Sequence, residues 1–302
     1  MSSSPERSWA PAAALLLNAF VWGVSWWPFR ELHRHGLHPL WATALIYSVS
    51  LVLLLIARPN AWRKLRSEPL LWLLMIASGL TNVGFNWGVT VGDVVRVVLL
   101  FYLMPAWTVV LAWIFLGERP TAASLLRLAI AMAGVVIVLK APETPWPVPQ
   151  TIADWLALAG GFSFASTNIV LRRLRHVESS ARIFSMFAGG TVLATLSALI
   201  GMSVALVPPL PAPQLEWTAV GLALSLGFLA SNMALQFGAS HLDAHSSALI
   251  MLSEVVFASV SSVALGAATL TPRVAAGGAL ILAAAAWSAW AGSSSNESDR
   301  AQ

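Results

Sequence analysis

Apolar and polar residues are arranged along the chain in long blocks. Ten mostly apolar stretches of about twenty residues are each long enough to cross a bilayer as a helix. Short polar segments separate them, and a proline-rich connection at residues 141–150 divides the ten into two sets of five. The predicted spans are residues 10–30, 40–57, 70–91, 94–116, 122–140, 152–172, 181–206, 217–238, 245–266 and 272–291. The pattern therefore predicts an all-α polytopic membrane protein with ten transmembrane helices.

Composition supports a membrane protein and excludes other classes. Hydrophobic residues make up 58% of the chain and charged residues 10%, far from the balance of a soluble globular protein. The net charge of +4 does not indicate nucleic-acid binding, because the basic residues lie at the ends of the spans. With the amino terminus inside, twelve Lys and Arg residues fall on the cytoplasmic side and five on the other. This bias predicts that both termini are cytoplasmic.

The two sets of five spans resemble one another. When the second half is shifted by 150 residues onto the first, four residues are identical: Asn82 with Asn232, Gly88 with Gly238, Asp93 with Asp243, and Thr121 with Thr271. The same shift pairs Asn86 with the chemically similar Gln236. Because each set has an odd number of spans, the second set is inverted relative to the first. We expect a first repeat at residues 10–140, a second at 152–291, and polar termini at 1–9 and 292–302, with the Ser-rich tail disordered. Inverted repeats predict a substrate site near the membrane midplane between them.

A proline interrupts the fourth apolar stretch. Water is absent at this depth, so the carbonyl freed by Pro105 must find a partner in the protein or in a wet cavity. The proline therefore indicates either a helix that lines a cavity or a simple packing kink. After this stretch, Gly117-Glu118-Arg119-Pro120-Thr121 is typical of a helix end, a polar turn and a new helix capped by Thr121.

These residues resemble a known family. Pro105, Gly117-Glu118-Arg119, Thr121 and an early Trp22-Gly23 are similar to the signatures of EamA domains in the drug/metabolite transporter superfamily. The second half departs from the pattern, with Val255 at the proline position and Ala267-Ala268 at the Gly-Glu position. The resemblance implies a secondary transporter that works by alternating access. Its nearest likeness is to bacterial exporters of neutral and aromatic amino acids of the YddG kind.

Polar amides lie inside several predicted spans. Asn82 and Asn86 are four residues apart and share a helix face, and Asn232 and Gln236 repeat that spacing in the second half. Asn168 is a weaker candidate of the same kind. Such amides either hydrogen-bond between helices or line a polar cavity. Their matched positions favour a cavity, so we include all five as candidate substrate-binding residues.

One carboxylate and several aromatic residues complete the candidate site. Glu254 lies near the centre of the ninth span, where an ionised carboxylate without a partner is costly. It is a candidate for proton coupling or for contact with a substrate ammonium group, and the alternative is a structural hydrogen bond to a neighbouring helix. The other candidates are deep aromatic residues and the proline, namely Trp22, Trp26, Trp87, Tyr102 and Pro105. For each aromatic residue taken alone, core packing or contact with lipid is the favoured interpretation.

The remaining chemistry argues against an enzyme. The six histidines lie in or beside loops, and the spans carry no nucleophile–base set and no paired carboxylates. There is no cysteine and no nucleotide-binding motif, so no metal or other cofactor is predicted. We predict a multi-pass transporter of the bacterial inner membrane, compatible with a monomer, whose partners are the lipid bilayer and a small neutral or zwitterionic metabolite. The alternatives are an exporter of drugs or cationic amphiphiles, a non-transporting membrane sensor and an intramembrane enzyme.

Overall fold

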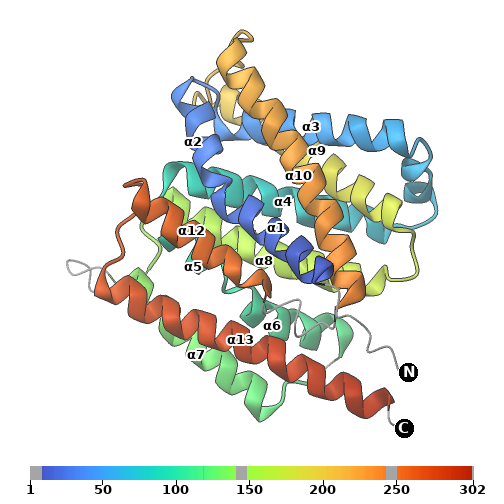
Figure 1. The fold of residues 1–302 in the computed structure, drawn as a ribbon, viewed down its shortest axis with the longest axis vertical. Helices are drawn as coiled ribbons and strands as arrows, with labels where there is room; N and C mark the ends of the chain where they lie inside the picture. The colour runs from blue at the N-terminus through green and yellow to red at the C-terminus, as the bar shows by residue number, and fades with distance from the viewer. Residues whose placement is uncertain (1–8, 118, 141–147, 243–249, 301–302) are drawn as a thin grey trace, which may run out of the picture.

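The computed structural model describes residues 9–117, 119–140, 148–242 and 250–300, and these residues form helices joined by loops, without a strand. Glu118 and Asp243, which the sequence motifs include, lie outside the described residues. Figure 1 shows the arrangement. The helices of the first half are α1 (Ala10–Val24), α2 (Trp26–Arg34), α3 (Pro39–Ala57), η1 (Ala61–Arg66), α4 (Leu70–Val91), α5 (Val94–Phe101), α6 (Met104–Leu116) and α7 (Ala122–Leu139). Those of the second half are α8 (Ile152–Arg173), α9 (Ser179–Ser203), α10 (Leu215–His241), α12 (Ser253–Ala264) and α13 (Pro272–Arg300).

The helical class predicted from the apolar blocks is confirmed. Six helical segments of the described chain are long and apolar enough to cross a membrane. They are Ala10–Arg34, Pro39–Ala57, Leu70–Val91, Val94–Leu116, Ser179–Ser203 and Leu215–Leu235, and shorter apolar helices lie at Leu125–Val138, Ser253–Ala264 and Pro272–Ala284. The number of ten spans stays a prediction. The Ser-rich tail differs from its prediction of disorder, because α13 continues as a helix to Arg300.

In the described part of the first half, the first and fourth predicted spans are interrupted helices. The first breaks at Ser25, whose hydroxyl donates to the carbonyl of Trp22 at 2.8 Å between α1 and α2. The fourth breaks at Tyr102 and Leu103, and α6 begins at Met104. Pro105 therefore lies in the first turn of α6, where its missing N–H leaves no hydrogen bond unmade. The proline starts a new helix here, which corrects the alternative of a kink within one continuous helix.

The two halves of the chain interleave. The most extensive helix pairings join helices of opposite halves, namely α4 with α8 and α9, α7 with α13, α3 with α9, and α1 with α10. In Figure 1, α7 and α13 run side by side at one edge of the bundle, while α3, α9 and α10 lie toward the other. The centre of the protein is therefore built from both halves at once.

Glycines allow the closest of these pairings. A Cβ atom on Gly189 would overlap the carbonyl oxygen of Met75, so α9 approaches the backbone of α4 directly. Gly134 of α7 and Gly277 of α13 face each other in the same way, each with its Cβ position within 2.7 Å of the other's carbonyl oxygen. Small residues that let backbones meet are the usual basis of helix association in membranes, where apolar side chains alone do not select a partner.

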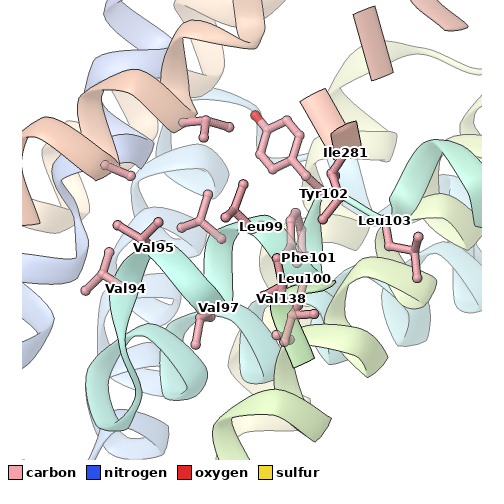
Figure 2. Packing of buried hydrophobic residues seen from close by; sticks show 14 of the residues in the cluster. Val94, Val95, Val97, Leu99, Leu100, Phe101, Tyr102, Leu103, Val138 and Ile281 are labelled. Carbon is pink, nitrogen blue, oxygen red and sulfur yellow. The ribbon is translucent and has the colours of Figure 1, made fainter. Parts of the chain in front are cut away.

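Two hydrophobic clusters form most of the core. One surrounds α5, and Figure 2 shows its residues from Val94 to Leu103 packed with Val138 of α7 and Ile281 of α13. The other joins α2, α3, α9 and α10 around Phe29, Tyr47 and Phe228. Trp22 packs against both clusters, so α1 lies at the junction between them.

Candidate functional site

The candidate site is centred on a contact between two buried polar residues from opposite halves. The hydroxyl of Tyr102, directly after α5, donates to Glu254 Oε2 at 3.2 Å and approaches the carbonyl oxygen of Met251 at 3.3 Å. Tyr102 is 3% exposed and Glu254 is 9% exposed. Glu254 lies in the first turn of α12, where the amino end of the helix favours a negative charge.

Helix interruptions in both halves create this contact. Tyr102 is the residue at which α5 ends, and in the second half a turn at Leu252 separates helical residues 250 and 251 from α12, which begins at Ser253. The first residues of the predicted span 245–266, up to residue 249, lie outside the described residues. A shift of 150 residues superimposes Met104, the first residue of α6, on Glu254. Discontinuous helices at the midplane are where secondary transporters place substrate and coupling sites, since unpaired backbone groups become available there.

The Trp22-Gly23 pair positions α1 against this site. A Cβ atom on Gly23 would lie 2.7 Å from the carbonyl oxygen of Glu254 and 2.7 Å from the Cβ of Phe257, so only glycine permits this approach. Trp22 stacks on Phe228 of α10 with ring centroids 4.6 Å apart. One turn later, Trp26 Nε1 donates to the hydroxyl of Ser261 on α12 at 2.9 Å.

A row of aromatic rings leads from α3 to Tyr102. The successive ring-centroid distances are 5.9, 4.6, 6.1, 4.9 and 6.4 Å along Tyr47, Phe228, Trp22, Phe85, Phe101 and Tyr102. These six residues come from α3, α10, α1, α4 and the end of α5, so both halves contribute. Separations of this size are typical of favourable aromatic pairs. The last ring of the row, Tyr102, is the one that donates to the Glu254 carboxylate.

The amides of α4 contact α3. Asn82 Oδ1 accepts a hydrogen bond from the Tyr47 hydroxyl at 2.6 Å, and Asn86 Nδ2 donates to the Thr43 hydroxyl at 3.2 Å. Asn86 is 0% exposed and its Oδ1 atom has no hydrogen-bond partner. A buried amide oxygen without a donor is costly. The contacts fit a role between helices, whereas the unpaired oxygen offers an acceptor to a further group.

The other predicted site residues are distributed more widely. The ring of Trp87 lies 5.3 Å from that of His38, which directly precedes α3. Asn168 on α8 and Asn232 on α10 are half-buried. The side chains of Pro105 and Gln236 lie outside the described part of the structure. Of the predicted residues, Trp22, Trp26 and Tyr102 are thus brought close to α12, which carries Glu254. Asn82 and Asn86 contact Tyr47 and Thr43 of α3 instead.

Sequence reasoning did not single out one buried polar pair. Asn18 on α1 donates through Nδ2 to the carbonyl oxygen and hydroxyl of Ser231 on α10, at 3.0 and 2.7 Å. Both residues are at most 1% exposed. A signal was present, because the shift of 150 residues superimposes Asn18 on Asn168. Within the described ranges, no group of three or more His, Asp or Glu side chains gathers as metal ligands would.

The chain is similar to known proteins in sequence and in fold. Residues 9–140 match the EamA-like transporter family. A protein of Streptantibioticus cattleyicolor named "probable terminal-alkyne amino-acid exporter" is 29% identical over 61% of this chain and 62% of its own length. An uncharacterized transporter of Pseudomonas aeruginosa is 29% identical over 48% of this chain and 50% of its own. The chain thus spans less than two thirds of these curated relatives. A solved crystal structure shares the fold, with a TM-score of 0.58 and 22% identity, over 91% of this chain and 96% of that one.

Proposed function

We propose that this EamA-type membrane transporter of the drug/metabolite transporter superfamily exports small amine-bearing metabolites, such as neutral and aromatic amino acids. Transport would proceed by alternating access through a central cavity between residues 10–140 and 152–291. The proposed location is the bacterial inner membrane, with both termini in the cytoplasm. The bias of Lys and Arg toward one side of the predicted spans supports that orientation.

The observation that carries this proposal is the buried contact between Tyr102 and Glu254. Among the ion pairs of the described residues, none involves Glu254. A carboxylate at this depth is stabilised by a cationic partner. The ammonium group of a substrate would supply that charge, and the neighbouring aromatic row would hold an apolar or aromatic substrate body.

Phosphorylated substrates fit less well. Phosphate groups are usually bound by arginine forks. Arg96 already holds Asp154 through Nε at 2.7 Å and Nη2 at 3.0 Å, at the amino ends of α5 and α8. The name of the Streptantibioticus relative agrees with an amino-acid substrate for this chain.

A second candidate function is export of cationic amphiphiles. The same combination of one carboxylate and a row of aromatic rings would attract a hydrophobic cation that lacks a carboxylate of its own. The two candidates differ in the substrate's second charged group. Under the first hypothesis, amino acids should be exchanged and should compete with one another. Under the second, their decarboxylated amines should be exchanged in preference to the amino acids.

Substrate exchange in reconstituted vesicles tests the function, with a panel of labelled amino acids and amines. Glu254→Gln keeps the size and one acceptor oxygen but removes the charge. If Glu254 binds the substrate ammonium, affinity should fall by roughly 10- to 150-fold. If Glu254 instead carries protons, exchange should persist while its response to a pH gradient disappears. Glu216→Gln, on the exposed first turn of α10, is the matched control and should behave as wild type.

Two results would count against the site or the function. Wild-type affinity and wild-type pH response in Glu254→Gln would show that Glu254 is only structural. Absence of exchange for every compound in the panel, with correctly folded protein in the vesicles, would contradict the transport function itself.

A further inference from the structure

Arg30 on α2 binds backbone carbonyls from both halves of the chain. Its Nε donates to Val89 at 3.2 Å and its Nη2 donates to Gly92, both at the carboxyl end of α4. Its Nη1 donates at 3.3 Å to Ala267, which follows α12 in the second half. A guanidinium offers several donors in one plane, so a single side chain can hold three carbonyl groups at once.

Asp93 binds the same loop of the second half. Its Oδ1 accepts from the backbone N–H of Arg96 at 2.9 Å and thereby caps α5. Its Oδ2 accepts from the backbone N–H of Thr269 at 3.2 Å. Residues 267–269 are therefore held by a cation at Ala267 and by an anion at Thr269, and both charged residues come from the first half.

These contacts lie at one end of the bundle and cover the candidate site. Ser261, which binds Trp26, lies about two turns after Glu254 along α12, where each turn of helix rises about 5.4 Å, and Ala267 follows the end of α12 at Ala264. The order from the end inward is thus the loop at 267–269, then Trp26 with Ser261, then Glu254. The Lys and Arg bias predicts that this end faces away from the cytoplasm.

Water can replace the hydrogen bonds of Arg30 and Asp93 to residues 267–269 more easily than it can replace the buried ion pair at the same end. Thr269 is exposed and Arg30 is half-buried. A hydrogen bond to a backbone group near the surface changes an equilibrium constant by only about 2- to 13-fold, because water can replace the lost partner. At the same end, Asp154 pairs with Arg96 and is only 1% exposed, so it fastens α5 to α8 firmly. Opening at this end is therefore easiest between the loop and the first half.

We propose that Arg30 and Asp93 form the outer gate of the transporter, closed in this structure by their hydrogen bonds to residues 267–269. Release of these bonds lets the end of α12 move away from α2 and α4 and opens a path toward Trp26 and Glu254. The gate rests on the proposed alternating-access function.

Cysteine accessibility tests the gate without a substrate. The chain has no cysteine, so Ser261→Cys provides a single reporter thiol below the gate. In intact cells, a membrane-impermeant thiol reagent added outside should label this cysteine slowly in the otherwise wild-type chain. Adding Arg30→Gln or Asp93→Asn should raise the labelling rate about tenfold each. Asp93→Asn is selective, because asparagine still caps α5 but loses one of the two acceptor oxygens.

Arg34→Gln is the matched control, since Arg34 lies on the same helix but is exposed and pairs with Glu31 of its own helix, at 3.2 Å. Its labelling rate should equal that of the Ser261→Cys chain alone. Unchanged labelling in folded Arg30→Gln, or in Asp93→Asn should Arg30→Gln not fold, would overturn the gate.

The gate and the proposed function fail in different ways. Faster labelling with no exchange of any amino acid or amine would support the gate and contradict the proposed substrates. Exchange with labelling that neither substitution changes would contradict the gate and leave the transport function standing.

Discussion

Replacing Gly23 by alanine tests whether the close approach of α1 to α12 positions Glu254. The new methyl group would lie 2.7 Å from the Glu254 carbonyl oxygen, 2.7 Å from Phe257 Cβ and 3.2 Å from the backbone nitrogen of Ala258. Ordinary van der Waals contact begins near 3.4 Å. None of these atoms is the end of a flexible side chain, so the two helices themselves must separate by several tenths of an ångström.

The expected effect on stability is moderate and the effect on transport is larger. Inserting a methyl group into a packed contact costs about 1–3 kcal/mol, which the better helix propensity of alanine offsets by less than about 1 kcal/mol. A net loss near 2 kcal/mol corresponds to a fall in melting temperature on the order of 5 °C. Because the movement displaces Glu254 relative to Tyr102, we expect exchange to slow by about tenfold or more.

The assay combines a thermal melt in detergent with exchange in vesicles. Gly221→Ala on α10 is the matched control, because a Cβ atom there meets nothing within 4 Å. It should leave exchange unchanged and stabilise the protein slightly, by up to about 1 kcal/mol. Wild-type melting and wild-type exchange in Gly23→Ala would refute the view that this glycine sets the position of Glu254.

Two further predictions concern stability. Burial, with a smaller contribution from His33, lowers the pKa of His38 from 6.5 to about 4, and the neutral Nδ1 of His38 accepts a hydrogen bond from the Leu40 N–H at 3.2 Å. Because folding favours the neutral imidazole, the stabilisation should be complete above pH 6.5. The free energy of unfolding should then fall by up to about 3 kcal/mol as the pH drops to 4. Melting temperatures from pH 7 to pH 4 check this, and in His38→Asn, which keeps the cap, the dependence should flatten. Arg96→Met should cost about 3–5 kcal/mol by leaving buried Asp154 without its cation. Adding Asp154→Asn should recover part of that loss, and a double variant that melts below Arg96→Met would contradict the reasoning.

The helical class followed from the sequence because it depends on local rules. In a bilayer every backbone N–H and C=O must be satisfied within its own segment, so an apolar run of sufficient length becomes a helix. Stretches such as Leu70–Val91 could therefore be predicted from composition and length alone. The choice of Glu254, Tyr102 and Trp22 as candidates had the same basis, since polar and large aromatic groups are conspicuous in an apolar run.

The partners of those residues depend on packing that no local pattern contains. Tyr102 and Glu254 are 152 residues apart in the sequence. They meet because the helices of both halves are interrupted at nearly equivalent positions of the 150-residue repeat. The sequence predicted a disturbed helix at Pro105, whereas the helix break lies earlier, at Tyr102 and Leu103. Because α5 ends there, the Tyr102 hydroxyl can reach α12.

Arg30 shows most clearly the difference between what the sequence predicts and what tertiary packing decides. From the sequence alone, Arg30 is one of the five cations predicted on the side away from the cytoplasm, which bears only on the predicted orientation. Its three acceptors are carbonyl groups at residues 89, 92 and 267, and every residue carries such a group. Only the approach of α4 and the end of α12 to α2 selects these three. Length and hydrophobicity thus determined which segments are helices, and tertiary packing decided which polar groups meet, because hydrogen bonds to the backbone leave no trace in the sequence.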